Sequence, residues 1–94
     1  MTRLSIVQIA GQYCGTHFEG EKIFFVLVPL LRRNEHIELD FAQVELASSS
    51  FFNELFGRIT EEFGEVALNK QLSYTSLKPR HRFVLERTRD AAPA

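Results

Sequence analysis

Two stretches of the chain carry clear periodic patterns of hydrophobic and polar residues. In the first, His36–Phe41, the hydrophobic residues Ile37, Leu39 and Phe41 alternate with polar ones. A period of two residues is typical of a β-strand that has one buried face. We therefore predict a strand over this stretch, with its acidic side chains either on a solvent-exposed face or clustered near the end of the strand.

The second pattern has the period of a helix. Hydrophobic residues stand at positions i, i+3, i+4, i+7 and i+11, which are Phe52, Leu55, Phe56, Ile59 and Phe63. This spacing places them on one stripe of a helix. Ser48–Ser50 precede the stripe and Gly64 follows it. Serine is common at the N-cap of a helix and glycine just after its last turn, so we predict a helix over Phe51–Phe63.

The residues before these patterns give weaker signals. Ile6 and Ile9 have the β-branched character that strands favour, and they predict a strand over Leu4–Ala10. The glycines within Gly11–Gly20 predict a turn or a short hairpin.

The segment Glu21–Arg33 is rich in large hydrophobic residues and fits two structures. Its density of Ile, Phe and Val suits a buried strand, whereas its length and its closing arginines suit a helix. Pro29 would cost about 3 kcal/mol in the middle of a helix. We prefer the helix, because the strand that follows needs a crossover connection, and the strand stays as the alternative.

The C-terminal part of the chain completes an alternating order of strands and helices. Leu68–Leu77 predicts a short strand, and Pro79 fits the first turn of a closing helix, Arg80–Arg89. Strands that alternate with helices predict an α/β layer with right-handed crossovers. A length of 94 residues favours one domain, residues 1–89, with Asp90–Ala94 as a flexible tail.

Composition excludes several classes of protein. The net charge of −1 gives no general attraction to nucleic acid or to an anionic membrane. Cys14 is the single cysteine, so no internal disulfide is expected and a reducing cytoplasm is favoured. The longest apolar stretch, Ile23–Leu31, falls short of the roughly 20 residues that cross a bilayer. We expect a cytoplasmic protein without a cofactor or a metal site.

The serines Ser48, Ser49 and Ser50 form the strongest candidate site. They stand where a strand leads into a helix, and the free amide groups and dipole of a helix N-terminus favour an anion there. A serine hydroxyl at this place suits phosphorylation or anion binding, although three serines can also act only as caps.

Four neighbouring residues extend this candidate site. Asp40, at the end of its strand, is expected near the serines, where it would repel a phosphate, help to bind a cation or cap a backbone amide. Phe51, Asn53 and Glu54 lie in the first turns of the helix. They are candidates for a surface that contacts a partner protein, with a solubilising role as the alternative for the two polar ones.

The run Ile37–Gly57 resembles the STAS-like family of small bacterial domains of unknown function. The pattern consists of a hydrophobic strand that ends in Asp-Phe, a short Val-Glu segment, and Ser-Ser-Phe followed by Asn-Glu-Leu and glycine; here these are Asp40-Phe41, Val44-Glu45, Ser49-Ser50-Phe51, Asn53-Glu54-Leu55 and Gly57. The resemblance implies a STAS-like sandwich, in which helices pack against a small mixed β-sheet.

Through this family the chain is similar to STAS domains that act as anti-sigma-factor antagonists. In those regulators a kinase of the histidine-kinase ATPase superfamily phosphorylates a serine at the start of the equivalent helix, and the phosphate blocks docking. Ser48 matches that serine by position. Ala47 stands where the antagonists usually carry Asp, and Ser50 replaces a glycine.

The resemblance favours a non-enzymatic signalling or protein-interaction module, whose partner would be a histidine-kinase-like ATPase or an anti-sigma factor. The alternative is a small nucleotide- or anion-binding module without phosphorylation. No serine can be tied to a catalytic base, so an enzyme is not expected. Apolar residues on several sides of Glu21–Arg33 suggest a homodimer. The closing helix is basic, but one short helix without a series of aromatic platforms is weak evidence for nucleic-acid binding, which is therefore not expected.

Overall fold

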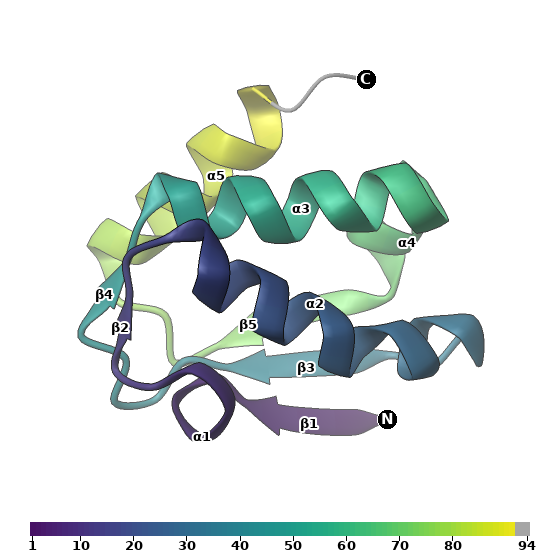
Figure 1. Ribbon diagram of the computed structural model, residues 1–94, viewed down its shortest axis with the longest axis horizontal. Helices are drawn as coiled ribbons and strands as arrows, with labels where there is room; N and C mark the ends of the chain where they lie inside the picture. The colour runs from purple at the N-terminus through teal and green to yellow at the C-terminus, as the bar shows by residue number, and fades with distance from the viewer. Residues whose placement is uncertain (92–94) are drawn as a thin grey trace.

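The computed structural model describes residues 1–91, which form an α/β layer (Figure 1). Its elements are β1 (Thr2–Ser5), α1 (Ile6–Ala10), β2 (Tyr13–Cys14), α2 (His17–Arg32), β3 (Ile37–Asp40), β4 (Leu46–Ala47), α3 (Ser49–Phe63), α4 (Glu65–Lys70), β5 (Leu72–Thr75) and α5 (Pro79–Ala91). The predicted α/β fold class is confirmed.

The strands form two small sheets. A three-stranded sheet has the order β1-β3-β5, and a two-stranded sheet pairs β2 with β4. Within residues 1–91 every pairing is parallel, in place of the single mixed sheet that we predicted. Parallel strands need crossover connections, and the helices between β1, β3 and β5 supply them.

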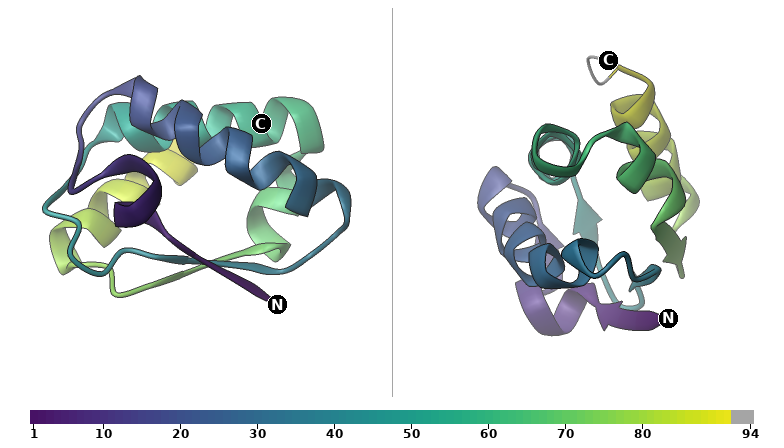
Figure 2. Two further views of the ribbon diagram at one scale, coloured as in Figure 1. Left: turned by 60° about the horizontal axis from the view of Figure 1, so that its bottom comes forward. Right: turned by 90° about the vertical axis from the view of Figure 1, so that its right-hand side faces the viewer.

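The three-stranded sheet has one apolar and one polar face. The register aligns Leu4 with Leu39 and Leu39 with Tyr74 on the apolar face. Helices α2 and α3 pack side by side over that face (Figures 1 and 2). The polar face carries two rows of side chains across the three strands. One row consists of Arg3, Glu38 and Ser73, and the other consists of Ser5, Asp40 and Thr75.

The core lies between the apolar face and the helices. Aromatic rings fill much of it: the ring centroids of Phe51 and Phe52 are 5.1 Å apart, and those of Phe52 and Phe56 are 5.5 Å apart. Their burial supplies a large hydrophobic contribution to stability.

The two periodic stretches and the ambiguous segment are confirmed in their type. β3 covers most of the predicted His36–Phe41 strand, and α3 begins at Ser49 after Ser48 as its N-cap. Glu21–Arg32 is helical, Arg33 is the C-cap, and α2 begins four residues before Glu21, at His17. Thr16 caps α2 through a capping box with Glu19. The helix holds Pro29 near its C-terminal end.

Two predictions near the N-terminus are wrong. The strand predicted over Leu4–Ala10 is present only as β1, which ends at Ser5, because the Ser5 side chain caps α1 by accepting a hydrogen bond from the Gln8 amide at 3.3 Å. Gly11–Gly20 is not a hairpin. Its strand β2 pairs with the distant β4, and its last residues already belong to α2.

The predicted C-terminal strand is shorter than expected, because α4 occupies Glu65–Lys70 and leaves Leu72–Thr75 as β5. The closing helix is confirmed as α5, and it extends to Ala91. It thereby includes Asp90, which we had placed in a flexible tail. The rest of that predicted tail, residues 92–94, lies outside the described residues. Within residues 1–91 no helix has the length and apolar character needed to span a membrane.

Candidate functional site

Ser48 is the N-cap of α3 and connects three elements. Its side-chain oxygen accepts a hydrogen bond from the Phe51 amide at 3.2 Å, and its carbonyl accepts one from the Phe52 amide. Its own amide donates to the Cys14 carbonyl at 3.0 Å, directly after the β2–β4 pairing ends. Ser48 is half-buried. The structure therefore places a hydroxyl where the amides of α3 converge, and uses that hydroxyl as a cap.

Ser49 and Ser50 follow as the first residues of α3, and both are exposed. Asn53 lies one turn further along and is also exposed. These side chains stand at the surface, where a ligand or a partner protein can reach them.

We had predicted that Phe51 belongs to a partner surface, and this prediction is wrong. It is fully buried, and its ring packs edge-on against Phe41, with the centroids 6.4 Å apart. Phe41, which directly follows β3, thereby contacts the first turn of α3. Both Phe51 and Phe52 therefore point into the core.

Glu54 is held within the fold. Its carboxylate lies 2.9 Å from Nε of Arg58, one turn away on α3. Arg58 also reaches Glu21 of α2, at 3.5 Å, and its guanidinium lies 5.3 Å from the centroid of the Phe25 ring. Glu54 thus belongs to a charged cluster that joins α2 to α3.

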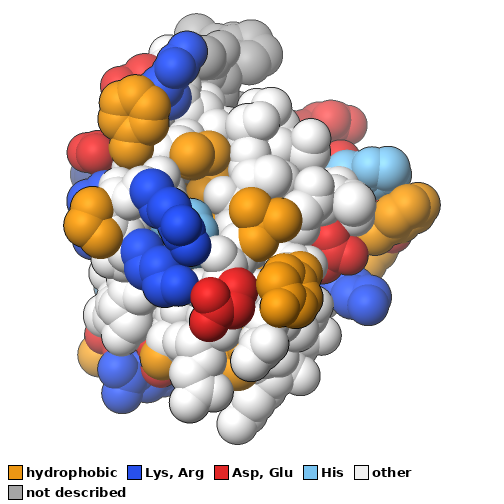
Figure 3. Space-filling view, turned by 90° about the vertical axis from the view of Figure 1, so that its left-hand side faces the viewer, with side chains coloured by type: hydrophobic (Ala, Val, Ile, Leu, Met, Phe, Trp, Pro, Cys, Tyr) orange, Lys and Arg blue, Asp and Glu red, His pale blue; other side chains and the backbone are white. Residues whose placement is uncertain are grey.

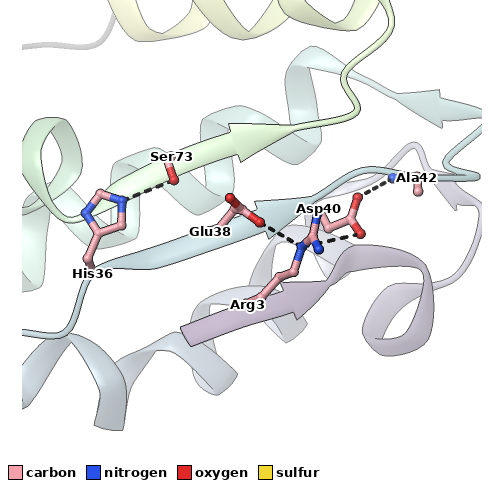
Figure 4. Close-up of polar contacts among 6 residues, drawn as sticks. All are labelled: Arg3, His36, Glu38, Asp40, Ala42 and Ser73. Atoms are coloured by element: carbon pink, nitrogen blue, oxygen red, sulfur yellow. Dashed lines mark hydrogen bonds and ion pairs between the residues drawn. The ribbon is translucent and has the colours of Figure 1, made fainter. Parts of the chain in front are cut away.

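Asp40 lies on the polar face of the three-stranded sheet (Figure 4). Its carboxylate accepts a hydrogen bond from the Ala42 amide at 3.0 Å and lies 3.9 Å from Nε of Arg3. The same Arg3 atom is 2.7 Å from Glu38. Asp40 therefore caps a backbone amide and takes part in an ion pair. Among the described residues, no hydrogen bond or ion pair connects Asp40 to Ser48, Ser49 or Ser50.

A groove separates the first turns of α3 from α5. It has a volume of about 410 Å³, and its walls are Ser49, Asn53, Phe83, Val84, Arg87 and Thr88. The guanidinium of Arg87 lies 5.6 Å from the centroid of the Phe83 ring. We did not predict the α5 wall of this groove. The sequence signal that pointed to it was the excess of basic residues in the closing helix.

Exposed hydrophobic side chains lie at the same end of the molecule. Tyr13 of β2 and Leu46 of β4 are register partners, and they are 67% and 44% exposed. Phe83 of α5 is 61% exposed. The start of α5 is tied to the residue before β4, since Arg80 donates to the Glu45 carbonyl at 3.1 Å. Figure 3, which looks onto this end, shows hydrophobic side chains interspersed with basic ones. We call Tyr13, Leu46 and Phe83 the end patch.

His81 is a buried titratable group near this end. It is 3% exposed, and neither ring nitrogen has a hydrogen-bond partner within residues 1–91. Burial lowers the pKa of His81, and the positive charges of Arg80 and Lys78 lower it further, while Glu45 opposes them. On balance, these effects lower the pKa of His81 and so favour the neutral form of its ring.

The thiol of Cys14 is also buried. Desolvation, with a smaller effect from the charge of Glu19, raises the pKa of Cys14 to about 11. A thiol with such a pKa is a poor nucleophile and a poor metal ligand at neutral pH. In the part of the chain that the structure describes, no three His, Cys, Asp or Glu side chains are grouped so that they could hold a metal ion.

A comparison with protein families shows to which family the chain belongs. The model of the family described as a STAS-like domain of unknown function (DUF4325) matches residues 19–82. This range covers more than half of the chain and includes the run Ile37–Gly57, on which the resemblance was based. No curated protein and no solved structure matches the chain.

Proposed function

Because the chain belongs to the family of STAS-like domains of unknown function, we propose that it is a non-enzymatic signalling or protein-interaction module, regulated by phosphorylation of a serine at the start of α3. The partner would be an ATPase of the histidine-kinase type or an anti-sigma factor. Such a kinase uses ATP, so the module would act in the cytoplasm.

The end patch is the observation that carries this proposal. Three large hydrophobic side chains from β2, β4 and α5 are exposed within one end of a small domain, where the serines of α3 also lie. Exposed hydrophobic residues rimmed by polar ones are typical of surfaces that bind another protein. A partner that covers the end patch would also lie over the first turn of α3.

Ser48 is the phosphate acceptor in this proposal. The kinase transfers the γ-phosphoryl group of ATP to the Ser48 hydroxyl, whose proton passes to a base of the kinase, and ADP leaves. The phosphate adds a charge of about −1.5 to −2 beside the N-terminal amides of α3, which stabilise it. Since a partner that covers Leu46 would have to remove water from this charge, phosphorylation weakens docking.

Phosphotransfer tests the switch directly. The purified chain is incubated with ATP and each histidine-kinase-type ATPase of the same genome, and the phosphate is located by mass spectrometry. We expect it on Ser48, with transfer lost in Ser48→Ala and retained in Ser50→Ala. If no serine among Ser48–Ser50 accepts a phosphate from any of these kinases, the switch is rejected.

Docking is tested separately with the kinase that transfers the phosphate, or with an anti-sigma factor of the same genome. Tyr13→Asp and Phe83→Asp should each weaken binding at least tenfold. Val66→Asp is the matched control, because Val66 is equally exposed but lies on α4. Equal binding by all three variants would contradict a docking surface at the end patch.

The groove between α3 and α5 supports a second candidate function, the binding of a nucleotide or another anion. Arg87 supplies a positive charge on one wall, and Ser49 supplies a hydroxyl at the helix N-terminus on the other. A ligand that binds the native state raises the melting temperature. Nucleoside triphosphates at millimolar concentration should therefore stabilise the wild-type chain and not Arg87→Ala, and an unchanged melting temperature would reject this function.

A further inference from the structure

The walls of the groove between α3 and α5 hold one charged residue, Arg87. Its side chain is exposed, and among residues 1–91 no carboxylate forms an ion pair with it. Its guanidinium lies 5.6 Å from the centroid of the Phe83 ring, and this attraction favours one position of the side chain. A guanidinium has five N–H donors and can hold a carboxylate through two of them. Arg87 is therefore available to pair with an acidic group of another molecule.

A second arginine lies on the same side of α5. Arg80 precedes Arg87 by seven residues, which is close to two helical turns. Arg80 donates to the Glu45 carbonyl at 3.1 Å, whereas the Glu45 carboxylate pairs with Lys78, at 3.3 Å. Within the part of the chain that the structure describes, the groove side of α5 thus carries two arginines that have no ion-pair partner.

The acidic residues of α5 do not line the groove. Glu86 directly precedes Arg87, so it lies about 100° away around the helix axis, and Arg82 shares its side of the helix at a spacing of four residues. Asp90 lies one turn beyond Arg87, but it is not a wall residue. The helix contains four arginines and two acidic residues, so its net charge is positive.

The α3 wall adds a positive field and no acidic residue. Its side chains, Ser49 and Asn53, are uncharged, and the N-terminus of a helix carries about half a positive charge. Glu54, the first acidic residue of α3, pairs with Arg58 at 2.9 Å and belongs to the cluster that joins α3 to α2. The groove is therefore electropositive, and its charge is complementary to an acidic occupant.

The groove also offers hydrophobic surface beside these charges. Phe83, which is 61% exposed, and Val84 lie on its α5 wall. Its volume is about 410 Å³. Since an apolar cavity of about 150 Å³ can bind benzene, the groove has room for about two large side chains. An occupant that carries hydrophobic groups next to a carboxylate would satisfy both kinds of surface.

The groove continues into the end patch, because Phe83 belongs to both. A small ligand confined to the groove would leave Tyr13 and Leu46 exposed. A protein that places one of its segments in the groove can cover these two residues as well. The continuity therefore favours a partner protein as the occupant.

From these features we infer that the groove is the docking site of an acidic segment of the partner protein, which carries one or two large hydrophobic residues close to an Asp or Glu. The hydrophobic side chains pack against Phe83 and Val84, and the carboxylate pairs with Arg87. This inference rests on the proposed function as a protein-interaction module, and it specifies the chemistry that the partner must have.

The same site gives the phosphate on Ser48 a further effect. Ser48 directly precedes Ser49, which is a wall residue of the groove. A phosphate at position 48 has the same sign of charge as the carboxylate of the segment, so it repels that carboxylate and competes for the positive charge of Arg87 and of the α3 N-terminus. Phosphorylation would therefore weaken docking by repulsion in addition to its cost of desolvation.

Selection from a peptide library tests the chemistry of the occupant. A phage library of random 12-residue peptides is selected on the immobilised, unphosphorylated chain, without ATP or a kinase. We expect enrichment of peptides that have a large hydrophobic residue within four positions of Asp or Glu, with Lys and Arg depleted. Selection of basic peptides, or of no peptide, would overturn the inference.

Variants then locate the enriched peptide, which is synthesised with a fluorescent label for anisotropy measurements. Arg87→Glu and Phe83→Asp should each weaken its binding at least tenfold. Arg82→Glu is the matched control, because it makes the same change of charge at an exposed position of α5 outside the groove, and it should weaken binding less than threefold. A peptide whose acidic residues are replaced by lysine should prefer Arg87→Glu to the wild type. Equal losses in Arg87→Glu and Arg82→Glu, in variants that circular dichroism shows to be folded, would exclude the groove as the site.

Two substitutions at position 48 test the effect of charge beside the groove. Ser48→Asp should weaken binding of the same peptide at least threefold. Ser48→Asn, which caps a helix as well but carries no charge, should weaken it less. Equal affinities of the two variants would overturn the regulation of the groove by a charge at position 48.

These outcomes are distinguishable from those that test the phosphorylation switch. Phosphotransfer to Ser48 without any selected acidic peptide would reject the docking segment and leave the switch. Binding of acidic peptides at the groove without phosphotransfer would reject the switch and leave the docking segment. If nucleoside triphosphates stabilise the wild type but not Arg87→Ala, and no acidic peptide is selected, the groove binds a nucleotide and the inference is wrong.

Discussion

Gly20 of α2 lies directly against the backbone carbonyl of Phe51 in α3. A Cβ atom at position 20 would be 2.5 Å from that oxygen and 3.1 Å from Cβ of Glu54. Real Cβ atoms do not approach so closely, so the distance between the start of α2 and the start of α3 depends on the absence of a side chain at Gly20.

Gly20→Ala should therefore destabilise the protein. The methyl group would force the two helices apart, and overpacking of this kind costs about 1–3 kcal/mol. Chemical denaturation followed by circular dichroism measures the change in the free energy of unfolding.

Gly57→Ala is the matched control. Gly57 lies inside α3, and a Cβ there would have no atom within 4 Å. Alanine is favoured over glycine in a helix by about 0.5–1 kcal/mol, so this variant should be more stable than the wild type. Equal effects of the two substitutions would contradict the close approach at Gly20.

Ser48→Ala should lower the stability of the protein by about 1 kcal/mol, because the Phe51 amide loses its capping partner. Ser48→Asp should keep most of the stability, since Asp is as good an N-cap as Ser. Thermal and chemical denaturation measure both effects. Ser50→Ala, at an exposed position in the first turn of α3, should change the free energy of unfolding little. A larger loss in Ser50→Ala than in Ser48→Ala would show that the cap is elsewhere.

The stability of the protein should fall as the pH is lowered through about 6.5, the ordinary pKa of His81. Burial lowers the pKa of His81 in the folded state, so below pH 6.5 the unfolded chain binds a proton that the folded chain does not. Acid thereby shifts the equilibrium towards unfolding. Measurements of the free energy of unfolding from pH 7 to pH 5 give the slope of stability against pH.

His81→Leu should make this slope smaller, and it should not reduce stability at pH 7 by much, because it also removes two ring nitrogens that lack partners. His17→Gln, at an exposed position, serves as the control. The burial of a neutral His81 would be refuted by a slope that His81→Leu leaves intact.

The Cys14 thiol should react very slowly in the native protein. Its pKa of about 11 leaves little thiolate at pH 8, and the side chain is fully buried. Iodoacetamide should modify Cys14 at an appreciable rate only after a denaturant is added, as mass spectrometry would show. Since the folded state holds the thiol proton more tightly than the unfolded chain does, stability should also fall as the pH rises from about 9 to about 11. Rapid modification of the folded chain would contradict the burial.

Local sequence patterns predicted the elements that have strong periodicity and missed those that depend on caps. The hydrophobic stripe of α3 and the alternating residues of β3 were sufficient to predict these two elements. Two sequence signals were available but unused: Ser5 and Gln8, and likewise Thr16 and Glu19, have the spacing of a capping box. They mark the starts of α1 and α2, where we had predicted a strand and a turn or short hairpin.

The candidate site was predicted only in part, because its members depend on long-range contacts. The serines follow from the boundary between a strand and a helix, which is local. The burial of Phe51 depends on Phe41, and the location of Asp40 depends on Arg3 across the β1–β3 pairing. Nothing in the local pattern around Phe83 shows that it faces solvent beside α3.

The parallel pairing of β2 with β4, and the hydrogen bond from Arg80 to the Glu45 carbonyl, have a consequence for the recognition of the end patch by a partner. In the docking function that we propose, Tyr13, Leu46 and Phe83 would form a discontinuous epitope, because they come from three separate segments of the chain. A synthetic peptide copied from any one segment would lack most of it. A partner that binds this epitope would therefore select molecules in which α5 has already packed over nascent ones that lack it.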